Sequence, residues 1–168
     1  MNYEINDLNV LKSYNLSILG RLNALCEPLK IFNITDFGYS KIIENEKLFR
    51  FSTHNRWTEV YFDNKLFNNV ECYRNLLSPT VFDENKKEII SIWTGEPSDS
   101  VSKIKLASGL WNGISIYEIK ENYIEVWAFG STIENSQLGS FYIKNLEFLK
   151  RFIVYFRNLA PDILDISQ

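Results

Sequence analysis

Two strand–turn–strand patterns constrain the fold of this 168-residue chain more than any other feature. Residues 37–43 and 48–52 flank one polar turn, and residues 114–119 and 124–130 flank a second. Strands that are joined by such short turns pair as antiparallel hairpins. A short apolar run over residues 89–93 adds a fifth strand.

Helical patterns lie before, between and after these strands. Large rings occupy both alternating sets of strand positions, which favours a sheet that helices cover on both faces. We therefore predict an α+β fold with one five-stranded antiparallel sheet. The expected helices are residues 8–29 with an end or distortion at Pro28, Trp57 to about Phe67, Ser98 or Asp99 to about Leu110 with Asn112-Gly113 closing it, and residues 138–159.

The last of these helices carries an apolar arc that is wider than one sheet face needs. A shoulder of three rings spaced seven apart, Phe141, Phe148 and Tyr155, lies beside its inner stripe. The shoulder predicts either a contact with the N-terminal helix or a dimer interface.

The composition predicts one globular domain over residues 1–168, located in the cytoplasm. Hydrophobic residues make up 45% of the chain, but no apolar run reaches the roughly 20 residues that span a membrane. The N-terminus has no secretory signal pattern. A net charge of −3 predicts no nucleic-acid binding by this chain alone. Cys26 and Cys72 lack metal or redox spacing, so we expect buried thiols.

The motifs of the common enzyme classes are missing from the sequence. It contains no P-loop and no dinucleotide-binding fingerprint. The single histidine, His54, has no serine or cysteine in a nucleophile motif near it. No cluster of histidine, cysteine or carboxylate residues has the spacing of a metal site. We therefore expect a protein that is not an enzyme, with no catalytic residue, no metal and no cofactor.

The aromatic residues Trp57 and Tyr61 lie four positions apart in a predicted helix, so their rings point to the same side. Each ring combines a large apolar body with one hydrogen-bonding group. Such a pair can pin an amphipathic helix to the core, or it can form the wall of a site for an amphipathic small molecule. Spacing alone leaves both interpretations open.

Four segments, in this order, give the chain a resemblance to a known family. They are 33–39 at the entry to the first strand, Trp57-x3-Tyr61, Ile92-Trp93, and 108–116 around Gly113. With these segments and its Phe-rich last helix, the chain from about Leu22 to Leu159 resembles the N-terminal autoinducer-binding domain of LuxR-type quorum-sensing regulators.

The resemblance implies an α-β-α sandwich of the PAS/GAF-like kind, with the ligand held between the sheet and the helix that carries the aromatic pair. It implies that the Trp57 indole N–H binds the carbonyl of an acyl-homoserine lactone. The Tyr61 ring would then pack over the signal, and Trp93 would close the head-group end. The other expected lining residues are Tyr39, Phe51, Phe62 and Ser115.

Two positions depart from the family's pattern of polar recognition. The family places an Asp-Pro pair shortly after the aromatic residues, whereas the corresponding stretch here is Asn68-Asn69-Val70-Glu71, in which Asn69 or Glu71 could supply an acceptor. A tyrosine one turn before the tryptophan is replaced by Thr53. Loss of one charge-assisted hydrogen bond costs about 1.5–3 kcal/mol, so the expected ligand is an amphipathic signal that is either lactone-like or of another kind.

The function expected from these observations is that of a small-molecule-binding sensory domain of a bacterial transcriptional regulator, with altered ligand specificity. The alternative is a ligand-free interaction module that dimerises with a full-length regulator or inhibits it. In the family, a DNA-binding helix-turn-helix follows this domain. The sequence fits both a domain cut from such a regulator and a natural stand-alone domain.

Overall fold

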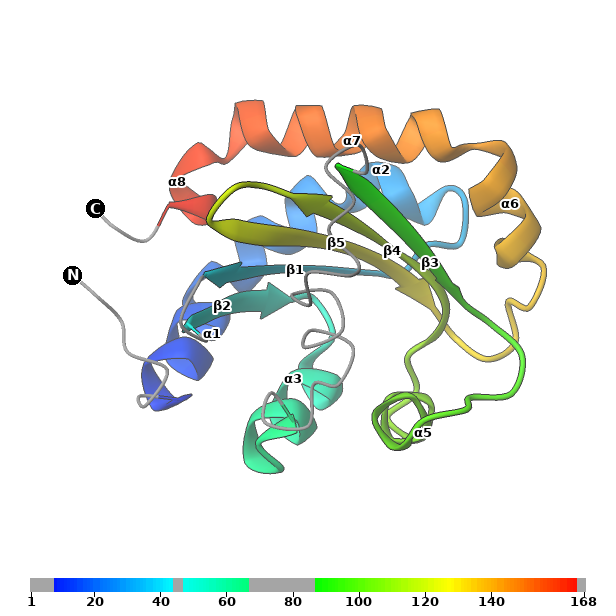
Figure 1. Ribbon diagram of the computed structural model, residues 1–168, viewed down its shortest axis with the longest axis horizontal. Coiled ribbons are helices and arrows are strands. Elements are labelled where there is room, and N and C mark those ends of the chain that lie inside the picture. Colours follow the sequence, from blue (N-terminus) through cyan, green and yellow to red (C-terminus); the bar gives the residue numbers. More distant parts are fainter. Residues whose placement is uncertain (1–7, 44–46, 67–86, 166–168) are drawn as a thin grey trace.

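Residues 8–43, 47–66 and 87–165 are described by the computed structural model (Figure 1). One five-stranded sheet, ordered β2-β1-β5-β4-β3, forms its centre, and all neighbouring strands are antiparallel. The two predicted hairpins are confirmed and meet where β1 pairs with β5. The strands are β1 (Asp36–Ile43), β2 (Lys47–Ser52), β3 (Glu88–Trp93), β4 (Trp111–Ile119) and β5 (Tyr123–Ser131).

Helices cover both faces of this sheet, as predicted. In Figure 1, α7, α6 and α2 lie on one side of the sheet, and α3 and α5 lie on the other. We call these sides the α7 face and the α3/α5 face. The helices are α1 (Leu8–Leu25), α2 (Glu27–Lys30), α3 (Asn55–Asp63), α5 (Ser100–Ala107), α6 (Leu138–Lys144), α7 (Leu146–Leu159) and α8 (Pro161–Leu164).

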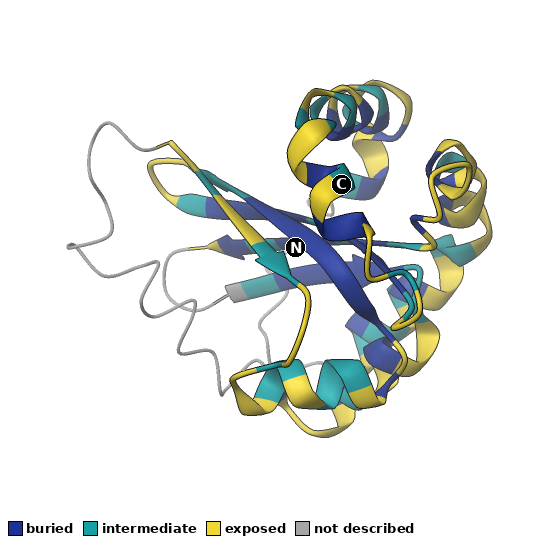
Figure 2. Cartoon of the chain, turned by 90° about the vertical axis from the view of Figure 1, so that its right-hand side faces the viewer, coloured by how far each residue is buried: buried dark blue, intermediate teal, exposed yellow. Residues whose placement is uncertain are grey.

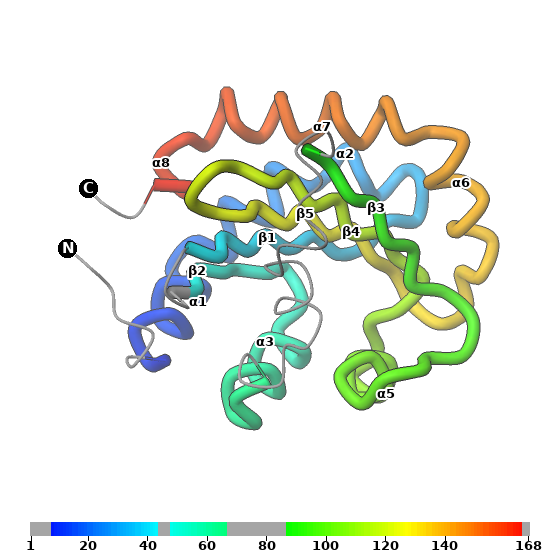
Figure 3. Tube along the Cα trace, in the orientation of Figure 1, coloured from blue at the N-terminus to red at the C-terminus, as the bar shows by residue number. Residues whose placement is uncertain are grey.

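The path of the chain explains how the α3/α5 face is covered. Figure 3 shows that the chain leaves β3, passes through α5 on that side and returns to β4. Buried residues gather on the sheet and on the helix surfaces that face it, while the outer helix surfaces are exposed (Figure 2). The sheet therefore forms the middle layer of a three-layer domain.

Two predicted helices are each divided in two. The first is interrupted at Cys26, between α1 and α2, where Pro28 begins a new turn. The last is interrupted at Asn145, which leaves helical geometry at φ −122° and ψ 28°. The Asn145 side chain donates to the carbonyl oxygen of Phe141 over 2.9 Å. A local bond of this kind competes with the helical pattern, which accounts for the break.

The ends of α5 confirm one prediction and correct another. Asp99 caps the helix, because its carboxylate accepts a hydrogen bond from the Ser102 amide over 2.8 Å. The helix is closed by Gly109 at φ +91° rather than by Asn112-Gly113. Asn112 does adopt the left-handed conformation, with φ +48°, but it does so in β4, at a bulge between Trp111 and Ile114.

The shoulder of the last helix has an internal partner. Phe32, just after α2, lies 5.1 Å from Phe141 and 4.8 Å from Phe148 between ring centroids. Tyr155 packs against Phe152 at 5.5 Å. The segment after α2 therefore covers part of this surface. A dimer interface there stays a prediction.

Candidate functional site

Helix α3 presents the aromatic pair to the sheet, and His54 fixes where this helix begins. Its Nδ1 atom accepts a hydrogen bond from the Trp57 amide over 3.0 Å, and its carbonyl oxygen accepts one from the Thr58 hydroxyl over 2.9 Å. His54 is thus the N-cap of α3. Trp57 and Tyr61 are both buried and meet edge to face at 5.7 Å.

Trp93 lies flat on a glycine surface of the sheet. A Cβ atom built on Gly113 would lie 2.2 Å from its ring, and one built on Gly130 would lie 2.7 Å from it. The indole therefore extends from the edge strand β3 across β4 to β5. Its N–H donates to the Ser115 hydroxyl over 3.1 Å. The absence of side chains at the two glycines sets the depth of this ring.

Lys105 connects the two tryptophans from α5. Its ammonium nitrogen lies 4.2 Å from the ring centroid of Trp93 and 5.5 Å from that of Trp57. Both distances are in the range of cation–π attraction. Rings from β3 and α3 therefore face a single cation on α5, and three elements that are distant in sequence contribute to one site.

Arg50 supplies a second cation from β2. Its guanidinium carbon lies 3.7 Å from the Tyr61 ring centroid and 6.0 Å from that of Trp57. The residue is 7% exposed, and its buried Nε atom has no hydrogen-bond acceptor among the described residues. A cation therefore lies directly beneath the aromatic pair.

The predicted site residues divide between the two faces of the sheet. Trp57, Tyr61, Trp93 and Ser115 lie on the α3/α5 face, and Phe62 packs against Tyr61 at 5.6 Å. Tyr39 and Phe51, which pair across β1 and β2, are turned to the α7 face instead. Phe51 stacks there on Phe156 of α7 at 6.1 Å. The structure thus brings five of the seven residues to one side and places the other two in the opposite core.

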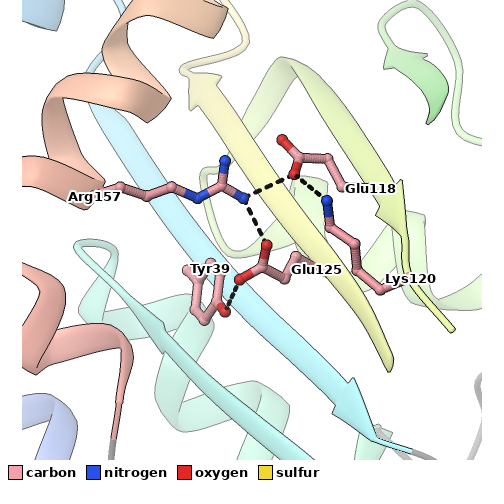
Figure 4. Close-up of polar contacts among 5 residues, drawn as sticks. All are labelled: Tyr39, Glu118, Lys120, Glu125 and Arg157. Atoms are coloured by element: carbon pink, nitrogen blue, oxygen red, sulfur yellow. Dashed lines mark hydrogen bonds and ion pairs between the residues drawn. The ribbon is translucent and has the colours of Figure 1, made fainter. Parts of the chain in front are cut away.

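Tyr39 belongs to an ionic network on the α7 face (Figure 4). Its hydroxyl donates to Glu125 over 2.7 Å. Arg157 of α7 donates to Glu125 over 2.6 Å and to Glu118 over 2.7 Å, and Lys120 also pairs with Glu118. Burial, followed by the nearby Glu125 charge, raises the pKa of Tyr39 well above its ordinary value. This side chain therefore serves the packing of α7 on the sheet.

Sequence reasoning missed Arg50 and Lys105, because a charged residue in a strand or short helix ordinarily contacts solvent. The alternation of β2 contained the signal. Phe49 and Phe51 point one way, so Arg50 must point the other, toward the aromatic pair.

The remaining residues singled out in the sequence lie away from the aromatic pair or outside the described ranges. The candidate acceptors Asn69 and Glu71, and the helix end at Phe67, lie outside the described residues, as does Cys72. Thr53, at the position of the family's tyrosine, accepts a hydrogen bond from the Phe37 amide over 2.9 Å at the end of the sheet. Cys26 is a buried free thiol, and burial raises its pKa to about 12.

A search of the described ranges finds no group of three or more His, Cys, Asp or Glu side chains that could hold a metal ion. The helices in the same ranges are all too short or too polar to cross a bilayer.

Comparison with known proteins identifies the fold. No protein-family model matches the sequence, and no curated protein matches it. The solved structure of CepR2 from Burkholderia cenocepacia, an N-acylhomoserine lactone dependent LuxR family transcription factor, aligns with a TM-score of 0.61 at 12% identity. The alignment covers 94% of this chain and 98% of that one. Escherichia coli SdiA aligns with a TM-score of 0.50 at 12% identity, over 94% of this chain and 71% of that one.

The TM-score of 0.61 over nearly the whole of both chains shows a shared fold. The chain has the α+β sandwich fold of LuxR-type autoinducer-binding domains, with a five-stranded antiparallel sheet. The fold predicted from the resemblance is confirmed.

Proposed function

We propose that this chain is the small-molecule-binding sensory domain of a LuxR-type bacterial transcriptional regulator. Its binding site would lie on the α3/α5 face and consist of Trp57, Tyr61, Trp93 and Ser115. One observation carries the proposal: α3, β3 and β4 bring these four side chains to the side of the sheet where two cations also lie. The protein would act in the cytoplasm, and it would respond to an amphipathic signal without catalysing a reaction.

The chemistry of the site fits such a ligand. Aromatic rings on α3 and β3 offer apolar contact area, and the Ser115 hydroxyl and the cations offer polar contacts at fixed positions. A ligand that enters the core would stabilise the folded domain by mass action. The signal would thereby change the stability of the domain, and through it the state of a regulator.

The test begins with native mass spectrometry of the purified protein, which detects a retained small molecule. Binding of an N-acylhomoserine lactone, a fatty acid and a long-chain alcohol is then measured by calorimetry. Trp57→Phe removes an indole N–H and part of a ring from the site. Trp127→Phe makes the same change on the α7 face, where Trp127 packs against Tyr39 and Phe156, and is the matched control.

We expect Trp57→Phe to weaken binding about tenfold while its melting temperature without ligand changes no more than that of the control. Equal affinities in the parent and both variants would contradict the site. A chain that retains no molecule and binds no probe would contradict the function itself.

A further inference from the structure

We infer that the site on the α3/α5 face takes an amphipathic anion, with the Arg50 guanidinium as the main partner of its carboxylate or phosphate group. This inference rests on the proposed function and names the chemical class of the ligand. Its starting point is the environment of Arg50, a cation held inside the domain.

Arg50 is 93% buried and makes no ion pair or side-chain hydrogen bond with the described residues. Its guanidinium lies over the rings of Tyr61 and Trp57. A guanidinium that leaves water without an oxyanion loses hydration that ring contacts replace only in part. A chain normally compensates such a charge, and no carboxylate among the described residues does so here.

The opposite face shows how this chain treats a buried charge when the partner is its own. There the side chain of Glu125 is 11% exposed and receives hydrogen bonds from both Arg157 and Tyr39. Glu118 likewise pairs with Arg157 and Lys120. Carboxylates and cations are thus matched on the α7 face.

Within its described strands, the α3/α5 face carries the Arg50 cation and a single carboxylate, Asp36. Serines, glycines and apolar side chains line this face from Gly38 to Ile42 and along β4 and β5. Asp36, at the end of β1, lies in hydrogen-bond range of Thr35 and Thr53 there. Lys105 adds a second positive charge above the same sheet surface. The charge of Arg50, which no described carboxylate neutralises, therefore favours a negatively charged group in the site.

The geometry of Arg50 leaves its donors usable. A guanidinium that stacks on a ring contacts it through its flat face, so its N–H groups point outward in the plane. At 3.7 Å from the Tyr61 centroid, Arg50 is at stacking distance. An oxyanion at the edge of this stack would receive two charge-assisted hydrogen bonds, while its apolar body would contact Trp57 and Trp93.

The experiment compares decanoate, decyl phosphate and decanol, which share a ten-carbon chain, by calorimetry on the full chain. We expect the anions to bind about 10- to 100-fold more tightly than decanol. Arg50→Met should remove this preference, and Arg50→Lys should retain part of it. Lys103→Met, which removes an exposed charge from α5, is the matched control and should keep the full preference.

Thermal unfolding without ligand provides an independent readout. If Arg50 lacks a counter-charge, Arg50→Met should keep or raise the melting temperature. A marked fall in that temperature relative to Lys103→Met would show that the protein itself compensates Arg50, and would overturn the inference.

The probes also separate the two proposals. Decanol that binds as tightly as the anions, in a manner that depends on Trp57, would overturn the anion inference and leave the sensory function standing. Preference for only one of the two anions identifies the head group and supports the inference. Failure of every probe, with no retained molecule, would overturn both proposals.

Discussion

Replacement of Gly113 by alanine tests whether Trp93 is seated on the bare backbone of the sheet. The added methyl group would lie 2.2 Å from two carbons of the Trp93 ring and 2.4 Å from the carbonyl oxygen of Phe129. Real Cβ atoms do not approach other atoms this closely, so the neighbours must move. At Gly130, the nearest atoms are the Cδ1 atom of Leu110 at 2.6 Å and the Trp93 ring at 2.7 Å, and both belong to side chains.

This difference sets the expected magnitudes. Overpacking that neighbouring side chains can relieve by moving costs about 1–3 kcal/mol. Replacement of glycine by alanine also restricts the unfolded chain, which offsets this cost by up to about 1 kcal/mol. Gly130→Ala should therefore lower the free energy of unfolding by about 1–2 kcal/mol. Gly113→Ala forces apart the backbones of β4 and β5 as well, so its loss should be about 3 kcal/mol or more.

Urea unfolding followed by far-UV circular dichroism measures both effects, and a Trp93→Ala background separates them. Without the ring, Gly130→Ala should lose part of its cost, because the Leu110 side chain remains but can move into the vacated space. Gly113→Ala should still cost about 2 kcal/mol because the Phe129 carbonyl remains. A Gly113→Ala variant within about 0.5 kcal/mol of the parent would refute this account of the sheet surface.

Further predictions concern the caps, the ionic network and pH. Removal of the α3 cap by His54→Ala should cost about 0.5–2 kcal/mol and should weaken ligand binding without removing a proposed ligand contact, as urea unfolding and calorimetry would show. Arg157→Met should lower the free energy of unfolding by about 3 kcal/mol, because Glu125 stays buried without its ion pair. Tyr39→Phe should lower it by about 1.5–3 kcal/mol. Stabilisation by either change would contradict the network. Burial raises the pKa of Cys26 from 9.0 to about 12, so its contribution to stability is complete below pH 9 and is lost as the pH rises toward 12. Cys26→Ala should flatten the fall in melting temperature over this range, and an unchanged slope would contradict the assignment.

Much of the fold could be predicted from local sequence signals. Short polar turns between alternating segments define both hairpins, and Asp99 is a residue type that caps helices. The positions at which helices end were harder to predict, because they depend on hydrogen bonds of individual side chains. Asn145 interrupts the last helix through a bond to Phe141, although the apolar period continues across it.

The composition of the site was harder to predict, because it depends on which face each strand residue occupies. Tyr39 aligns with Trp127 on β5, which aligns with Ile116 on β4, so Tyr39 and Ser115 point to opposite faces. A shift of one residue reverses every side chain of a strand. The spacing of Trp57 and Tyr61 identified their shared direction, since both lie on one helix, but it carried no information on the register of distant strands.

The alternation of side chains along these strands also assigns packing to one face of the sheet and the proposed ligand contacts to the other. On β2, Phe49 packs against Tyr14 of α1 and Phe51 packs against Phe156 of α7, while Arg50 between them faces the proposed ligand. Exchange of Arg50 would thus alter ligand preference with little disturbance of the packing beneath it. A domain built this way can change its ligand specificity one side chain at a time while the opposite face keeps it folded.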